Sequence, residues 1–176
     1  MKRHMILGLF LVIALLGVSV SVQADAPRSI TGGVDFEMTI YTGETVMTSA
    51  MYQIRELDPI THQAQGTYQW WTKTDMRDRL AVDVDCVIFS EDMTEATFSG
   101  RPTLMKNWLE WQLTDYVLIH VVDGGTPGSQ GDWHGFSMGD MGIGYSCDPC
   151  RDEGCLEETL ATFMYPVSRG NLTIQR

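Results

Sequence analysis

The stretch Asp115–Gly139, DYVLIHVVDGGTPGSQGDWHGFSMG, constrains the fold more than any other part of the chain. Its first nine residues are rich in β-branched and aromatic types, and both alternating sets carry apolar side chains. That pattern is typical of a strand covered on both faces. Asp123–Gly128 must turn, because glycine allows positive φ and proline lacks a ladder donor. Trp133–Met138 then alternates again, so we predict a central hairpin with a long loop.

A period of two recurs along most of the chain. It is clearest in Val34–Tyr41, where alternate residues from Val34 to Ile40 are apolar. Further strands are expected at Thr45–Leu57, Gly66–Lys73, Arg79–Phe89, Glu95–Arg101 and Gly170–Gln175. Within Arg79–Phe89 the inward residues would be Leu80, Val82, Val84, Cys86 and Ile88.

Two segments fit more than one kind of element. Pro102–Leu113 suits a helical stripe or a strand, and we favour a turn running into a strand. Leu156–Met164 suits a short helix or a strand. About eight short strands with turn residues between them predict an all-β domain. Pairing the first strand with the last would remove both free edges, so we expect a closed, calycin-like antiparallel β-barrel, with a β-sandwich as the alternative.

The N-terminus has the features of a secretory signal. Residues 1–24 begin with a basic tetrapeptide, continue with the apolar run Met5–Val22 and end in small residues suited to cleavage. The alternative is a retained membrane anchor, because the run approaches the length that spans a bilayer. We expect cleavage, since no basic stop-transfer cluster follows. Residues 25–32 would then be an N-terminal lead-in, and 33–176 a single β-domain.

The charge of the chain excludes some partners. Loss of the signal would leave 10 Lys and Arg against 23 Asp and Glu, a formal net charge of −13. Sequence-independent nucleic-acid binding needs a basic surface, so it is not expected, and neither is adhesion to an anionic membrane. We expect an acidic, monomeric protein that is secreted, periplasmic or held at the cell surface, with an unknown extracellular ligand or surface partner.

The four cysteines predict disulfides. They are Cys86, Cys147, Cys150 and Cys155, and an exported protein meets an oxidising compartment. Three connectivities exist, of which we favour Cys86–Cys150 with Cys147–Cys155. A zinc site would need a second close pair or nearby histidines, and a redox-active C-x-x-C would be opposed by the surrounding carboxylates.

Three short motifs carry a resemblance to known proteins. They are Gly32-Gly33-Val34-Asp35-Phe36, the turn Val121–Gly128 and the closing Gly170-Asn171-Leu172-Thr173-Ile174. With these the chain resembles small secreted bacterial all-β domains of unassigned function. The Cys147–Cys155 segment departs from that pattern. The resemblance implies a secreted β-domain and offers no catalytic residue to carry over.

Two patterns suggest catalysis or metal binding, and each has a simpler structural explanation. Gly135–Gly139 matches G-x-S-x-G, but no histidine follows Ser137, and the nucleophile elbow requires a strand-turn-helix. Asp123, Asp132 and Asp140 could offer hard oxygen ligands to calcium. Their spacing fits no EF-hand loop, so turn-capping carboxylates explain them better.

A few histidines and tryptophans are candidates for binding. His120 alternates with apolar residues and is expected to be a hydrogen-bonded core histidine. Trp71 and Trp133 are phased opposite to their apolar neighbours, so they are the candidate ligand-binding residues, together with His134. We expect an exported, non-catalytic binding or structural domain with no cofactor. The alternatives are a metal-dependent hydrolase at the Asp123–Asp140 loop, and a carrier of a small apolar ligand in the barrel.

Overall fold

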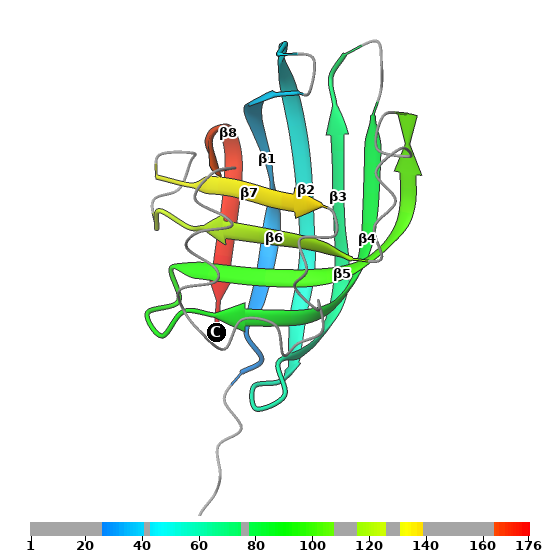
Figure 1. Ribbon diagram of the computed structural model, residues 1–176. Helices are drawn as coiled ribbons and strands as arrows, with labels where there is room; N and C mark the ends of the chain where they lie inside the picture. The colour runs from blue at the N-terminus through cyan, green and yellow to red at the C-terminus, as the bar shows by residue number, and fades with distance from the viewer. Residues whose placement is uncertain (1–25, 41–42, 75–77, 108–115, 126–130, 139–163) are drawn as a thin grey trace, which may run out of the picture.

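The protein is an eight-stranded closed antiparallel β-barrel (Figure 1). The computed structural model describes residues 26–40, 43–74, 78–107, 116–125, 131–138 and 164–176. The strands are β1 (Ser29–Thr39), β2 (Thr45–Asp58), β3 (Gln63–Thr72), β4 (Arg79–Phe89), β5 (Glu95–Lys106), β6 (Val117–Val122), β7 (Trp133–Met138) and β8 (Met164–Gln175). The predicted fold class is therefore confirmed.

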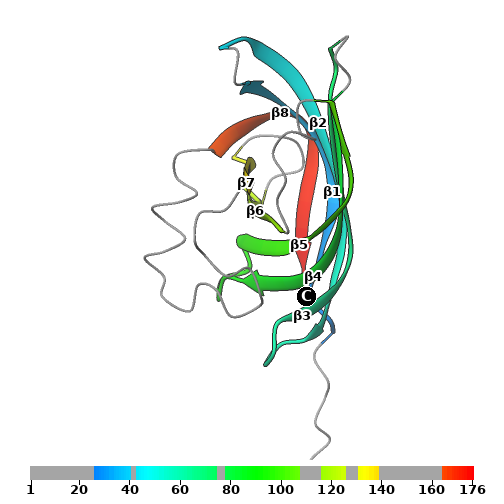
Figure 2. The ribbon, with the colours of Figure 1, turned by 45° about the vertical axis from the view of Figure 1, so that its right-hand side comes forward.

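Closure joins the first strand to the last. Each strand pairs with the next along the chain, and β1 also pairs with β8. Ile30 of β1 is thus opposite Ile54 of β2 on one side and Ile174 of β8 on the other. In Figure 2 the long strands β1 to β4 form one curved wall, and β6 and β7 lie across from it. The closure that the sequence predicted is confirmed.

The alternating residues of β1 enter the core as predicted. Val34, Phe36 and Met38 are all at most 3% exposed. The prediction for β4 is correct only for its first half. The β4–β5 register shifts between Val84 and Cys86, and a bulge of this kind exchanges the two faces of a strand. As a result Val87 belongs to the core cluster, and Cys86 does not.

Strand β5 is longer than predicted and bends sharply, as Figure 1 shows. A Cβ atom at Gly100 would lie 2.1 Å from the carbonyl oxygen of Asp83, so only glycine allows β4 and β5 to approach this closely here. Before the bend β5 pairs with both β4 and β6, and after it the ladder with β4 continues. Pro102 lies in this second half, where a missing N–H is tolerated.

The predicted start of the β-domain needs a correction. β1 begins at Ser29, so the second half of the segment 25–32 is strand and not lead-in. The proposed signal peptide, the residues after Asn107 in Pro102–Leu113, and 156–163 lie outside the described residues. Among the residues that the structure does describe, no helix is long and apolar enough to cross a bilayer.

Candidate functional site

Ring side chains from five strands meet inside the barrel. They are Phe36 of β1, Tyr52 of β2, Tyr68 of β3, Phe98 of β5 and His134 of β7, and each is at most 1% exposed. In contacting pairs the ring centroids lie 4.4 to 6.2 Å apart. We call these five residues the ring cluster. Its members come from opposite walls, so they fill the interior at this level.

His134 is the polar centre of the ring cluster. Its Nδ1 atom lies 2.7 Å from the hydroxyl of Tyr52, and its Nε2 atom lies 3.1 Å from the hydroxyl of Tyr68. Burial lowers the pKa of His134 to about 3, and burial raises the pKa of each tyrosine well above 10. The imidazole is therefore neutral at ordinary pH, with one nitrogen accepting and the other donating a hydrogen bond.

The three candidate ligand-binding residues do not form one site. His134 faces the interior, and its neighbour Trp133 faces out and is 40% exposed. Trp71 also faces out, but it lies on β3, and three strands separate β3 from β7 in either direction around the barrel. Strand alternation and barrel closure send these residues to three different places, so a role of each in ligand binding stays a prediction.

The candidate calcium ligands anchor the loop between β6 and β7. The carboxylate of Asp132 accepts hydrogen bonds from the backbone N–H groups of Gly124 and Leu172, at 2.9 and 3.2 Å. Asp123 does the same for Gly125 and Ile174, both at 2.8 Å. These contacts support the turn-capping interpretation. Asp140 lies outside the described residues.

Sequence reasoning gave no reason to notice Asp78. This residue precedes β4 and is fully buried, and neither of its carboxylate oxygens has a hydrogen-bond partner among the residues that the structure describes. Its backbone N–H donates to the hydroxyl of Thr72. A hard cation requires several oxygen ligands, and no group of three or more metal-ligating residues occurs in the described part of the chain. One carboxylate alone does not make a metal site.

His120 is hydrogen-bonded, as expected, but it lies outside the core cluster. The side chains of Val117, Ile119 and Val121 fill the interior, and His120 alternates with them onto the outer face of β6. Its Nδ1 atom is 2.8 Å from the hydroxyl of Thr97, and its Nε2 atom is 3.4 Å from the carboxylate of Glu95.

The hydroxyl, imidazole and carboxylate of Thr97, His120 and Glu95 follow the order of a nucleophile, base and acid. Thr97 is directly opposite His120 in the ladder and is 8% exposed. The backbone around Thr97 pairs with both β4 and β6, so its N–H groups are committed to the ladder and not free to bind an oxyanion. The geometry favours a cross-strand hydrogen-bond network.

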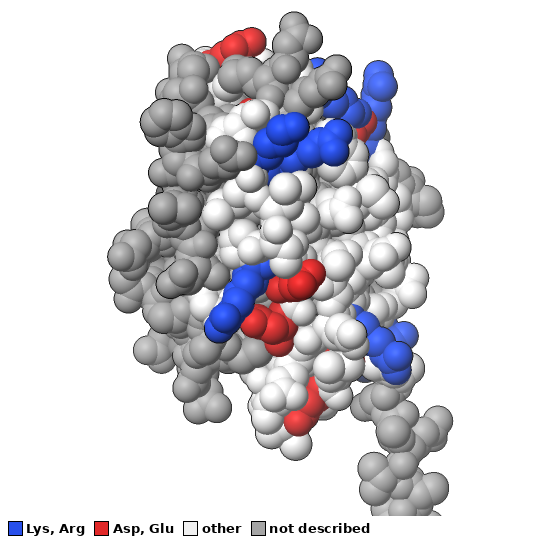
Figure 3. Space-filling model, turned by 90° about the vertical axis from the view of Figure 1, so that its right-hand side faces the viewer, with Lys and Arg blue, Asp and Glu red and all other residues white. Residues whose placement is uncertain are grey.

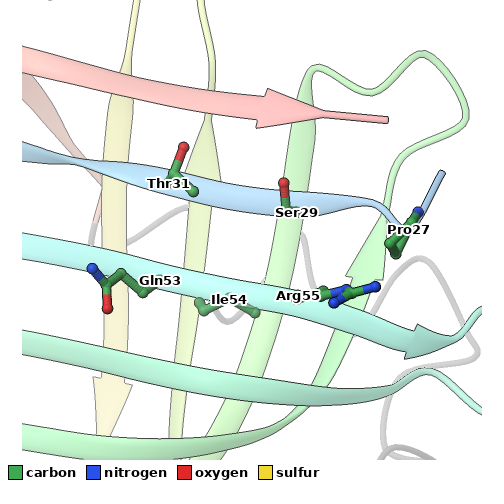
Figure 4. A pocket seen from close by; sticks show the side chains of 6 residues that line it. All are labelled: Pro27, Ser29, Thr31, Gln53, Ile54 and Arg55. Atoms are coloured by element: carbon green, nitrogen blue, oxygen red, sulfur yellow. The ribbon is translucent and has the colours of Figure 1, made fainter.

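The outer face of β1 and β2 carries a shallow groove of about 410 Å³ (Figure 4). Short side chains on β1 create it, since Ser29 and Thr31 lie opposite the longer Arg55 and Gln53 of β2. Pro27 lies near Arg55 at one end, as Figure 4 shows. We call these five residues, with Ile54, the β1–β2 groove. It offers two hydroxyls, an amide and a guanidinium to a ligand.

The charge of Arg55 distinguishes the groove from its surroundings. The neighbouring Arg28 binds both carboxylate oxygens of Glu56 and lies 5.0 Å from the ring centroid of Phe89. Arg55 is exposed and forms no ion pair with any residue that the structure describes. Arg28 is thus used within the fold, and Arg55 is available to a ligand.

The G-x-S-x-G match and the cysteines give little support for a catalytic site. Ser137 of the G-x-S-x-G match lies within β7, opposite Leu118, and not at a turn. Of the four cysteines, Cys86 is buried on β4 and the other three lie outside the described residues, so the predicted connectivity stays a prediction.

No protein-family model, curated protein or solved structure matches this chain. The function must therefore be argued from the arrangement of its own residues.

Proposed function

We propose that this protein is an exported, non-catalytic binding domain that takes its ligand on the outer wall of the barrel. The observation that carries the proposal is the ring cluster. Five rings from opposite walls are in contact where a carrier would hold its cargo, and all are at most 1% exposed. A side-chain-filled barrel of eight strands has no room there for a ligand, so binding falls to the surface.

The β1–β2 groove is the surface that we assign to the ligand. Arg55 contributes a cation that has no ion-pair partner among the described residues, and Ser29, Thr31 and Gln53 contribute hydrogen-bond donors and acceptors. A guanidinium with adjacent hydroxyls suits a carboxylate or phosphate on a polar molecule. We therefore propose a small anionic, hydroxyl-bearing ligand.

Export and disulfide bonding are part of the same proposal. The apolar run before Val22 and the acidic composition support secretion, or retention in the periplasm or at the cell surface. Cys86 is buried on β4, and we propose that it forms a cystine in the oxidising compartment that an exported protein meets. A monomer without a cofactor remains our expectation.

A backbone amide NMR titration tests the groove. With acetate, inorganic phosphate and glucose as probes, we expect the two anions to shift the signals of Ser29, Thr31 and Arg55. Arg55→Gln should abolish these shifts because the uncompensated charge is lost. Gln53→Ala should weaken them, and the matched control Gln69→Ala, an outward glutamine on β3, should not.

Two outcomes would contradict the proposal. One is that the anions leave the signals of the β1–β2 groove unchanged. The other is saturable one-to-one binding of an apolar fluorophore that shifts Tyr52 and Phe98, since this would place the ligand inside the barrel and favour the carrier alternative.

A further inference from the structure

Two cations are directly opposite each other at the other end of the barrel. Arg79 of β4 and Lys106 of β5 are register partners, and both are exposed. Like charges in this position repel and destabilise a sheet. Neither residue forms an ion pair with any described residue, although the chain carries 23 acidic side chains. The fold thus keeps a costly pair of positive charges at its surface.

Arg101 on the same two strands provides the contrast. It is the register partner of Asp83, and both its Nε and Nη2 atoms donate hydrogen bonds to the hydroxyl of Tyr116. Burial raises the pKa of the nearby Asp85 carboxyl, and the positive charge of Arg101 partly offsets this rise. Figure 3 shows this face of β4 and β5. In this view the basic atoms at the lower left lie against acidic atoms, whereas white, uncharged atoms lie next to the basic atoms at the upper centre.

An aromatic side chain extends the cationic pair. Trp71 of β3 is the other register partner of Arg79, and it is partly exposed. Trp71, Arg79 and Lys106 therefore form a row across three strands, with neighbouring strands roughly 4.8 Å apart. The 46% exposed Leu104 lies beside this row on β5. We call Trp71, Arg79 and Lys106 the cationic row.

We propose that the cationic row binds an acidic polysaccharide. A sugar ring stacks on the indole of Trp71, and carboxylate or sulfate groups of the same chain pair with Arg79 and Lys106. The row is narrow, and the carboxylates nearest to it on the same outer wall are beside cations: Asp35 pairs with Lys73, and Asp83 is opposite Arg101. The chain as a whole has a formal net charge of −11, which opposes a broad anionic surface such as a membrane or a nucleic-acid duplex, whereas a single polysaccharide chain can follow the row.

The test is a binding measurement by calorimetry with the intact processed protein. Oligomers of polygalacturonate and dextran sulfate are the probes, and neutral dextran is the control ligand. We expect the acidic probes to bind at 50 mM salt and to weaken at 200 mM, because salt screens exposed charges. The double variant Arg79→Ala/Lys106→Ala should bind at least about tenfold more weakly. Trp71→Ala should bind about threefold to tenfold more weakly.

Arg101→Ala is the matched control, since it removes a cation from the same strands. It should stay within about twofold of the unmodified protein, as expected for an already paired surface charge. Loss of the like-charge pair should leave the melting temperature of the double variant unchanged or raised, so weaker binding would not reflect unfolding.

Several results would overturn the proposal. Unchanged affinity of the double variant would do so, as would equal affinity for neutral dextran. Binding to vesicles of phosphatidylcholine and phosphatidylglycerol without binding to either acidic polysaccharide would assign the row to a membrane. The cationic row is separate from the β1–β2 groove, so Arg55→Gln should leave polysaccharide affinity unchanged whichever way the anion titration turns out.

Discussion

His134 and His120 lie on neighbouring strands one step apart in register, yet they have opposite environments. Val121 is the partner of His134, and His120 is the partner of Gly135. His134 faces inward, is fully buried and is held between two tyrosine hydroxyls. His120 faces outward, is partly exposed and bonds a threonine and a glutamate. A histidine side chain is thus part of the packed interior on one face of the barrel and a surface hydrogen-bonding group on the other.

The difference teaches that strand parity decides the role of a residue in this barrel. A shift of one position moves a side chain to the other face. The inner face is closed and desolvated, so a polar group there must have all its partners. The outer face is open to water, so the same network contributes less to stability.

Replacing each histidine by alanine should give the largest contrast. His134→Ala removes a ring from the packed interior and leaves two buried hydroxyls unpaired, so we expect a loss of about 3 to 5 kcal/mol in the free energy of unfolding. His120→Ala should cost about 0.5 to 1.5 kcal/mol. Urea denaturation followed by tryptophan fluorescence measures both. Equal losses would show that the two faces are not energetically distinct.

Acid should destabilise the protein through His134. Its folded pKa of about 3 is below the unfolded value of about 6.5, so the unfolded state takes up a proton first as the pH falls. Stability is then complete above about pH 6.5 and decreases by about 2 kcal/mol at pH 5. The carboxyls of Asp35, Asp58 and Asp92 have lowered pKa values and add to the loss only below about pH 4.

Denaturant melts between pH 7 and pH 5 test this pH dependence. His134→Gln should remove most of it, and His120→Gln only a smaller part, since His120 is less buried and Glu95 opposes the lowering of its pKa. If the slope survives in His134→Gln, another group is responsible.

The stability lost on removal of each tyrosine hydroxyl should follow the length of its hydrogen bond to His134. Tyr52→Phe leaves a buried imidazole nitrogen without a partner and should cost about 1 to 2 kcal/mol. Tyr68→Phe should cost less, because its hydroxyl is 3.1 Å from the imidazole and that of Tyr52 is 2.7 Å away. Chemical denaturation of both variants measures the difference, and the reverse order would contradict the bond assignment.

The smallest effects are expected on the outer face. Thr97→Val should reduce stability by about 0.5 to 1 kcal/mol. Glu95→Gln should hardly change stability, since Glu95 is half exposed, but it should lower the pKa of His120 further, because the carboxylate raises that pKa. A proton NMR titration of the histidine ring signals reads this shift. No change would mean that the carboxylate does not reach the imidazole in solution.

Much of the fold could be predicted from short-range patterns. The bounds of β4 and β7 agree with the predicted ranges, because period-two alternation and turn residues are local properties. The bulge after Val84 could not be predicted, since an extra residue is visible only against the partner strand. The length of β5 was underestimated, because proline usually ends a strand and Pro102 lies where a missing N–H is tolerated.

The candidate sites could not be predicted in the same way as the strands, because each site combines residues from neighbouring strands. Arg79 and Lys106 are separated by 26 intervening residues, and only the register makes them neighbours. The same holds for Arg55 and Ser29, and for the hydroxyls that hold His134. An outward cation in a strand can be recognised from the sequence, but whether a carboxylate or another cation lies beside it cannot.

The sequence by itself determined that this chain forms an all-β domain of alternating strands, because each strand carries its own inner and outer faces in its residue order. The tertiary structure alone decided which histidine would be buried, which carboxylates would cap turns and which cations would have no ion-pair partner among the described residues. The physical reason is that burial and pairing arise between strands, at a register that closure of the barrel sets.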